Sequence, residues 1–323
     1  MSERMRSGEN RGINDLIFRQ FVLRGHTEVA GVRTWDIADS KLWYLTSEQA
    51  KGFLTIEHSP EYSAAVTEKE VTLIREHAGA VARAMERRAT NLIDLGCGDG
   101  KKAVLCIEHF AKEMPVRYCP IDISSYMVQE ASHAVEEMGV APVERIFWNI
   151  SDFENLDNVT PLFRSDTFPH HCFLFLGNTL GNFNRDDILH GIRRGMQEGD
   201  ALLIGNGISE GRSPEEWVRT YAISEMDDFC VRVPMQAGLA RDNLRFDVQF
   251  IDDCIEVRYI VKDSVTVRGL GKSVEFRAGD VIRTVISYKY SRAQLESMLR
   301  EFFGDVTVHT DAEQTYALAV CKV

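Results

Sequence analysis

The sequence lacks the long apolar segments that membrane insertion or secretion requires. No apolar run approaches the roughly 18 residues of a membrane-spanning helix, and charged residues interrupt every long mixed run. The N-terminal segment is polar and has no apolar core of the kind found in signal peptides. These absences predict a cytoplasmic protein with no membrane partner.

Paired cysteines and an excess of positive charge are also missing. The 7 cysteines are scattered, odd in number and never arranged as C-x-x-C, so a disulfide framework and a structural zinc site have little support. Free, buried thiols in a reducing compartment are the simplest interpretation. The chain carries 37 Lys and Arg against 49 Asp and Glu, a net charge of −12. Such a balance disfavours a nucleic-acid partner, because general affinity for nucleic acid depends on neutralising phosphates.

Short apolar runs alternate with helical segments from Asn91 onward. The expected strands cover residues 91–95, 116–121, 145–148, 171–176 and 201–204. This alternation predicts an α/β fold with a mostly parallel sheet. The preceding segment, residues 13–88, has a mostly helical pattern, in which Thr67 to Glu70 fit a capping box at the start of a helix.

Strand-like alternation dominates a later part of the chain. Expected strands cover residues 245–250, 255–261, 265–267 and 281–288. Ser213-Pro214 marks the start of a helix before them, and Ser291 to Gln294 form the capping box of a final helix. Two more strands, over residues 306–309 and 316–320, end the chain. A β-rich insertion therefore interrupts the α/β part.

The segment D-L-G-C-G-D-G, residues 94–100, lies between a buried strand and a helix. Its glycines allow a tight turn and the close approach of a ligand, and the helix N-terminus behind them favours anionic groups. A dinucleotide fingerprint, G-x-G-x-x-G, would need glycine where this sequence has Lys101. The loop alone leaves a hydride-transferring enzyme as an alternative class, and Lys101 counts against it.

Acidic residues follow the next two expected strands. Asp122 ends the second strand and can accept hydrogen bonds from both hydroxyls of a ribose. Asp152 and Phe153 follow the third, where a carboxylate can bind the amino group of adenine and a ring can cover its face. Open α/β sheets bind ligands at the carboxyl ends of their strands, so these residues and the glycine loop predict one nucleoside site.

The glycine loop, the acidic positions and the terminal strand pair together resemble class I S-adenosylmethionine-dependent methyltransferases. Residues 175–183, F-L-G-N-T-L-G-N-F, resemble more closely the F-L-G-S-T-I-G-N segment of the histidine Nα-methyltransferases of ergothioneine pathways. Their fungal relatives that methylate dimethylallyltryptophan share this segment. Further segments match in family order over roughly residues 40–323: residues 60–62, 98–102, 120–124, 199–205, 218–221, 276–280 and 287–290.

The resemblance implies a cofactor, S-adenosylmethionine, and no metal. The residues that it places at the cofactor are Asp94, Gly96, Gly98, Lys102, Asp122, Asp152, Phe153 and Gly177. It also implies that Asn182 binds the amino-acid backbone of the substrate, assisted by Tyr62 and Tyr221, and these three are the catalytic candidates. Tyr44 and Phe53 match aromatic residues that close the pocket, although aromatic residues in such positions are more often part of a core.

The expected pocket for the substrate side chain departs from the family pattern. Val285 stands where the histidine enzymes have a glutamate, Val257 stands where they have a methionine, and Ser287 is retained. A buried group that loses its hydrogen-bond partner costs about 1–3 kcal/mol, so histidine should bind poorly. The valines suit an aromatic or indole-type side chain. A guanidine-bearing side chain is the other candidate, because five acids could supply carboxylates: Glu225, Asp227, Asp228, Asp247 and Glu256.

The sequence thus predicts an N-methyltransferase of a free amino acid or a derivative of one, with a place in natural-product biosynthesis. A true histidine Nα-methyltransferase and a non-catalytic cofactor-binding protein are the alternatives. A monomer or a homodimer is expected. We predict five parts along the chain: a disordered tail (1–12), a helical part of a substrate domain (13–90), the methyltransferase core (91–206), a β-rich insertion belonging to the substrate domain (207–285) and the C-terminal part of the core (286–323).

Overall fold

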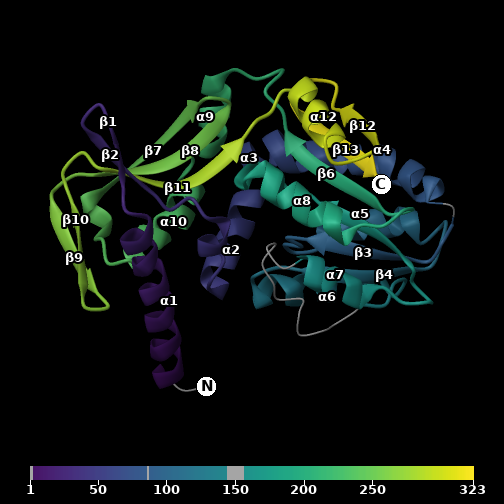
Figure 1. Ribbon diagram of the computed structural model, residues 1–323, viewed down its shortest axis with the longest axis horizontal. Coiled ribbons are helices and arrows are strands. Elements are labelled where there is room, and N and C mark those ends of the chain that lie inside the picture. The colour runs from purple at the N-terminus through teal and green to yellow at the C-terminus, as the bar shows by residue number, and fades with distance from the viewer. Residues whose placement is uncertain (1–2, 86, 144–155) are drawn as a thin grey trace. The chain divides into compact units, whose positions relative to one another are not determined.

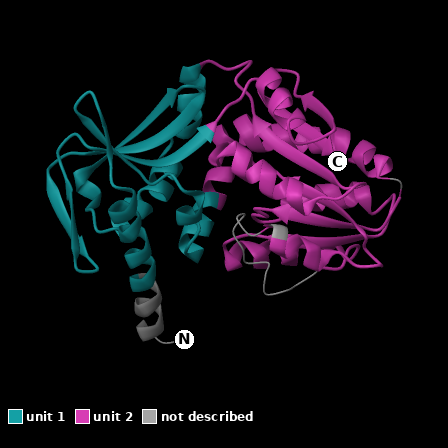
Figure 2. Ribbon diagram, viewed as in Figure 1, with its two compact units in different colours: residues 1–53, 214–287 teal, residues 54–213, 288–323 magenta. Residues whose placement is uncertain are grey.

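A computed structural model describes the backbone of residues 3–85, 87–143 and 156–323 (Figure 1). The chain forms two compact units, each made from two stretches of sequence (Figure 2). Unit 1 contains residues 1–53 and 214–287, and unit 2 contains residues 54–213 and 288–323. Helix α2 (Ser47–Glu57) contains the first boundary between them. The five-part division expected from the sequence stays a prediction, although helix α1 (Glu3–Arg24) begins within the expected tail.

Unit 2 is built on a six-stranded sheet with the strand order β12-β13-β6-β5-β3-β4. Four neighbouring strands are parallel, and β13 pairs antiparallel with β6 and with β12. The elements of unit 2 that follow α2 are α3 (Pro60–Tyr62), η2 (Ser63–Thr67), α4 (Glu68–Ala84), β3 (Thr90–Leu95), α5 (Lys101–Phe110), β4 (Val116–Ile121), α6 (Ser125–Met138), α7 (Leu156–Phe163), β5 (His170–Phe175), η5 (Thr179–Asn182), α8 (Arg185–Gly195), β6 (Ala201–Gly207), α12 (Arg292–Arg300), β12 (Asp305–Thr310) and β13 (Tyr316–Lys322). This is the α/β fold of class I methyltransferases, with a further unit added.

Every residue of β3 and of β6 is buried, as expected of central parallel strands covered on both faces. Parallel pairing brings the carboxyl ends of β3, β4 and β5 to one edge of the sheet: Asp94 in β3 lies opposite Pro120 in β4 and Leu174 in β5. The segments that follow these three strands therefore begin side by side. This edge is where the glycine loop, Asp122 and Gly177 are found.

Unit 1 contains a five-stranded sheet of order β1-β2-β11-β8-β7 and a separate β9-β10 hairpin. Its elements besides α1 are β1 (Thr27–Val29), β2 (Val32–Asp36), η1 (Ser40–Trp43), α9 (Pro214–Tyr221), α10 (Ser224–Cys230), α11 (Arg232–Gln236), η6 (Arg241–Asn243), β7 (Leu244–Ile251), β8 (Cys254–Val261), β9 (Val265–Gly269), β10 (Lys272–Phe276) and β11 (Val281–Tyr288). The expected strands of the insertion are confirmed, and β10 is an additional one.

The helical pattern expected over residues 13–88 is wrong between α1 and η1, where the chain forms strands β1 and β2. Strand β2 pairs in parallel with the distant β11. Its buried Arg33 donates to Asp280 Oδ1 at 2.9 Å, and the Trp35 indole nitrogen donates to Asp280 Oδ2 at 2.9 Å. This strand is stabilised by hydrogen bonds to a residue nearly 250 positions away in the sequence. Local periodicity therefore could not predict the strand.

The expected capping box at Thr67 is also wrong. Thr67 has helical dihedrals and caps nothing with its side chain, because the π-helical turn η2 continues directly into α4. The capping box of α12 is confirmed, with Ser291 and Gln294 bonding each other's backbone amides. The strand expected over residues 145–148 lies outside the described residues.

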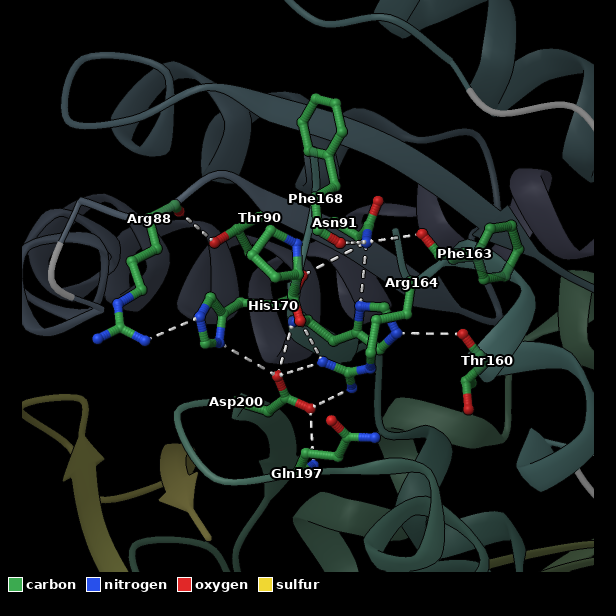
Figure 3. A network of polar contacts seen from close by, with 12 residues as sticks. Arg88, Thr90, Asn91, Thr160, Phe163, Arg164, Phe168, His170, Gln197 and Asp200 are labelled. Atoms are coloured by element: carbon green, nitrogen blue, oxygen red, sulfur yellow. Dashed lines mark hydrogen bonds and ion pairs between the residues drawn. The ribbon is translucent and has the colours of Figure 1, made fainter. Parts of the chain in front are cut away.

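At the amino ends of β5 and β6 a buried carboxylate organises several loops (Figure 3). Asp200 is almost fully buried and pairs with Arg164, the two closest atoms being 2.7 Å apart. Its oxygens also accept from the backbone amides of His171 and Gln197, each at 2.8 Å. His171 in turn contacts Thr160 and Asn91 through its two ring nitrogens. This network ties α7, β5 and the turn before β6 together.

All seven cysteines are free and buried, which confirms the thiols expected from the sequence. Among the described residues, no helix combines the length and apolar character needed to cross a membrane.

Candidate functional site

The glycine loop follows β3 and turns through three left-handed residues before α5 begins. Gly96, Gly98 and Gly100 have φ angles of 72°, 54° and 77°, which side-chain-bearing residues rarely adopt. A Cβ on Gly100 would lie 2.7 Å from Ala131 Cα, so this glycine lets α5 and α6 pack closely. A Cβ on Gly98 would meet no protein atom within 4 Å. Gly98 thus leaves open space beside the loop, as the close approach of a ligand requires.

Asp122 lies next to this loop at the end of β4. The backbone amides of Gly96 and Cys97 donate to the carbonyl of Ile121, which brings the start of the loop to the start of the Asp122 segment. The Ser124 amide donates to Asp122 Oδ1 at 2.9 Å. Burial raises the pKa of Asp122 to about 6, against the opposing effect of the amides of Ser124, Gly98 and Ile123. Above this pH the carboxylate is ionised and can accept hydrogen bonds from hydroxyl groups.

Asp94 is the other buried acid at this edge. Its Oδ2 accepts from the Tyr118 hydroxyl at 2.7 Å. Burial raises the pKa of Asp94 to about 7, and the Tyr118 hydrogen bond opposes the rise. Asp94 is therefore tied to β4 through Tyr118, whereas Asp122 lies directly after the end of β4.

Cofactor binding should depend on pH through Asp122. Only the ionised carboxylate can accept from two ribose hydroxyls, and its ionised fraction falls as the pH falls through about 6. We expect the dissociation constant for S-adenosylhomocysteine to be constant well above pH 6 and to rise about tenfold per pH unit below it. Isothermal titration calorimetry over this pH range would measure the change. The Asp122→Asn variant should bind more weakly at high pH and lose the transition near pH 6; an unchanged pH profile in that variant would contradict the assignment.

Lys102 and Gly177 lie together on the same side of unit 2. Lys102 stands in the first turn of α5, and its Nζ lies 2.9 Å from Glu57 Oε1 and 3.1 Å from Glu70 Oε2. Burial alone would lower the pKa of Lys102, but the two carboxylates outweigh this effect and hold the pKa well above its usual value. A Cβ on Gly177, which follows β5, would lie 3.1 Å from Lys102 Nζ. Buried Tyr62 is close enough to Lys102 and Tyr316 to influence both pKa values.

Asn182 ends the short helix η5, just beyond Gly177. Gly181 makes this position possible, because a Cβ there would lie 2.7 Å from the Tyr288 carbonyl oxygen. Asn182 is partly exposed, and its side chain makes no hydrogen bond within the described part of the chain. The related residue Asn178 has a structural task instead: it is buried, has a φ of 63° and accepts from the Gly207 amide. The Nδ2 of Asn178 is buried and has no partner among the described residues, so of the two asparagines Asn182 has the amide that solvent can reach.

The other candidates for the substrate site lie in unit 1. The Tyr221 hydroxyl and Ser287 Oγ are 3.2 Å apart, and both residues are buried. The rings of Tyr44 and Phe53 meet edge to face with centroids 5.4 Å apart. Phe229 completes this aromatic group, 5.8 Å from Tyr44 and 6.0 Å from Phe53. Sequence reasoning missed Phe229, because it follows the acidic pair Asp227-Asp228 in a segment with no motif of its own.

The two valines of the expected side-chain pocket are both buried. Val257 in β8 is fully buried and Val285 in β11 is 4% exposed. Neither strand position carries a charge, so the valines provide an apolar environment in unit 1.

Three of the five acids considered for a guanidine-bearing substrate already pair with arginines of this chain. Asp227 Oδ2 lies 2.5 Å from Arg241. Asp247 pairs with Arg258 across the β7–β8 ladder. Glu256 Oε1 lies 2.5 Å from Arg283. The remaining two are Glu225, which accepts from Ser224, and the exposed Asp228.

Asp152 and Phe153, expected at the adenine, lie outside the described residues. The others fit S-adenosylmethionine by their chemistry: an open glycine turn, an acid for ribose hydroxyls, and the Lys102–Gly177 pair beside them. The structure brings Gly96, Gly98 and Asp122 together, and separately Lys102, Gly177 and Tyr62, all within unit 2.

Comparison with known proteins gives the following matches. The model of a family described as "Histidine-specific methyltransferase, SAM-dependent" matches residues 40–323. The N-methyltransferase fsqC of Aspergillus fumigatus is 23% identical over 290 residues, which cover 86% of this chain and 77% of that protein. Among solved structures, an S-adenosylmethionine-dependent methyltransferase from Clostridium acetobutylicum is 14% identical with a TM-score of 0.46, covering 84% of this chain and 98% of that one. The 1,6-didemethyltoxoflavin-N1-methyltransferase of Burkholderia thailandensis is 12% identical with a TM-score of 0.40, covering 84% and 86%.

Proposed function

Because this chain belongs to the histidine-specific family and is therefore an S-adenosylmethionine-dependent methyltransferase, we propose that it methylates the nitrogen of a free amino acid or of a small molecule derived from one. The observation that carries this proposal is Asn182, whose amide is available in the same unit as the glycine loop and close in sequence to Gly177. The N-methyltransferase name of the Aspergillus relative also supports it.

For methyl transfer, the main task of the protein is to position the substrate nitrogen relative to the cofactor. The cofactor, when bound, supplies an electrophilic methyl group on a sulfonium. The attacking nitrogen must be neutral and in line with the breaking bond, which a pocket achieves by fixing the amine. Asn182 has an acceptor for an amine N–H and donors for a carboxylate, so it can orient both ends of an amino-acid backbone. Tyr62, which lies in the same unit as Asn182, would also bind this backbone, and Tyr62 or a water would accept the amine proton.

An aromatic, indole-type side chain is the substrate class that we favour. Asp227, Asp247 and Glu256 are each neutralised by an arginine of the chain, and a guanidinium substrate would have to displace these partners. Val257 and Val285 are apolar, and the aromatic residues of unit 1 include Phe229. These features favour burial of a ring over recognition of a cation.

Histidine itself should be a poor substrate. With Val285 in place of a carboxylate, a buried imidazole N–H would lack an acceptor, at a cost of about 1–3 kcal/mol. We expect kcat/KM for histidine to be about 10- to 100-fold below that for the best indole-bearing amino acid. The Val285→Glu variant should reduce the difference in kcat/KM between histidine and the indole-bearing amino acid. Val267→Glu, a change elsewhere in unit 1, should leave that difference as it is. A wild-type enzyme that prefers histidine would contradict the prediction.

The decisive experiment incubates the purified protein and S-adenosylmethionine with each of the twenty amino acids and with prenylated tryptophan. Mass spectrometry then detects the addition of one, two or three methyl groups and, by fragmentation, the nitrogen that carries them. Methylation of an amino acid on nitrogen is the expected result. Binding of S-adenosylhomocysteine without turnover of any amine would instead support the non-catalytic alternative. We also propose a cytoplasmic protein, monomeric or homodimeric, with a place in natural-product biosynthesis.

A further inference from the structure

We propose that Glu70 is a positioning residue for the amino-acid end of the cofactor, acting through Gly177 and Lys102. This inference rests on the proposed function only in assigning those two residues to the cofactor. Glu70 stands in the first turn of α4, in a segment where the sequence indicated no more than a helix start. In the folded chain its carboxylate does not cap the helix but binds groups from other elements of unit 2.

The Glu70 carboxylate is fully buried and connects four elements of unit 2. The backbone amide of Gly177, after β5, donates to Oε1 at 2.8 Å and to Oε2 at 3.1 Å. The hydroxyl of Tyr316, in β13, donates to Oε1 at 2.9 Å. Lys102 Nζ, in α5, lies 3.1 Å from Oε2. Both oxygens are therefore used, and two of their partners are residues that the family resemblance places at the cofactor.

Strand β6 is shaped to admit this carboxylate. A Cβ on Gly205 would lie 1.7 Å from Glu70 Oε1 and 2.8 Å from its Cδ. No side-chain-bearing residue fits at that point of the strand while Glu70 keeps its place. The carboxylate thus packs against the backbone of a fully buried central strand, in space that only glycine leaves free.

The peptide between Leu176 and Gly177 is held from both sides. Its N–H donates to Glu70, and its carbonyl oxygen accepts from the Thr179 hydroxyl. Gly177 has a φ of 74°, a conformation available to glycine and with no regular secondary structure to maintain it. Glu70 therefore supplies the backbone hydrogen bond that fixes the direction of the chain between Gly177 and η5.

A purely structural explanation for Glu70 would be the docking of α4 on the sheet. An apolar side chain can dock a helix without the desolvation penalty of a carboxylate, and such replacements of buried ionic groups are often neutral or stabilising. Glu70 instead orients the ammonium of Lys102, which directly follows the glycine loop, and the peptide of Gly177, which follows the carboxyl end of β5. The functional role predicts an effect on cofactor binding that the docking role does not.

The test compares Glu70→Gln with the matched control Glu68→Gln, an exposed residue two positions earlier in the same turn of α4. Glutamine keeps the shape but weakens the acceptance of three donors and removes one of the two negative charges beside Lys102, the other being that of Glu57. We expect Glu70→Gln to raise the KM for S-adenosylmethionine and the dissociation constant of S-adenosylhomocysteine about tenfold, with kcat and the KM for the amine changed less than threefold. Glu68→Gln should leave all four values unchanged. If Glu70→Gln lowers only the melting temperature and leaves cofactor affinity unchanged, the proposal is overturned.

A second variant keeps the test decisive if Glu70→Gln folds poorly. Tyr316→Phe removes the hydroxyl that donates to Glu70 Oε1 and that also contacts the backbone of Asn178. It should weaken S-adenosylhomocysteine binding about two- to fivefold, and unchanged binding would count against the proposal. Calorimetry with S-adenosylhomocysteine needs no methyl acceptor. A protein that binds S-adenosylhomocysteine but methylates no amine would therefore refute the proposed function, whereas the effect of Glu70→Gln on binding would still decide the role of Glu70.

Discussion

Replacing Asn182 with alanine should reduce kcat/KM for the amine about 100- to 1,000-fold while S-adenosylhomocysteine still binds. The side chain is partly exposed and makes no hydrogen bond within the described residues, so its loss should not disturb the fold. Alanine removes both the acceptor for the amine and the donors for the carboxylate, and misplacement of a reacting group costs about this much in rate. Steady-state kinetics by mass spectrometry and calorimetric titration of the cofactor product measure the two quantities.

Asn184 provides the matched control for this experiment. It lies two residues further along, is exposed, and caps α8 by accepting from the amides of Asp186 and Asp187. Aspartate is an equally good cap, so Asn184→Asp should retain both turnover and stability. Turnover by Asn182→Ala at the wild-type rate would refute the proposed role of Asn182 in holding the substrate.

The Asp200→Ala variant should lose about 3–5 kcal/mol of unfolding free energy, which is the usual effect of removing one partner of a buried ion pair. Alanine would leave the Arg164 guanidinium without its carboxylate and the amides of His171 and Gln197 without their acceptor. These groups come from the end of α7, from β5 and from the turn before β6, so one change disconnects three segments.

Urea denaturation followed by circular dichroism measures this loss directly. Asp166→Ala is the control, because Asp166 is an exposed acid in the loop between α7 and β5, and exposed substitutions usually change stability by less than about 0.5 kcal/mol. A difference between the two variants below about 1 kcal/mol would show that the network contributes little to stability.

The parallel part of the methyltransferase sheet could be predicted from the sequence because its determinants are local. Strands β3, β4, β5 and β6 are short, mostly apolar segments bounded by glycines and polar turns, and such segments indicate buried strands by themselves. The glycine loop was equally visible, since a left-handed turn between a strand and a helix favours glycine. The cofactor candidates Gly96, Gly98 and Asp122 followed from this order of elements.

The paired elements of unit 1 were harder to predict. Strand β2 is short, and it is held by pairing with β11 and by Asp280, far along the chain. Asp227, Asp247 and Glu256 looked like available carboxylates because their arginine partners lie on other strands or loops. Phe229 in α10 contacts Tyr44 and Phe53 only in the folded chain, so its place in the aromatic group could not be predicted from the sequence pattern.

Glu70 shows most clearly which features follow from the sequence and which depend on the tertiary structure. By itself the sequence determined the class of fold, the family, the order of the binding segments and the presence of a helix at Glu70, because each depends on residues close together in the chain. It also suggested that Glu70 caps that helix. Only the tertiary structure decided that Thr67 continues a preceding helical turn and that the Glu70 carboxylate passes Gly205 to reach Gly177, Lys102 and Tyr316. The physical reason is that a buried carboxylate must find donors, and those donors come from strands and helices brought together only by folding.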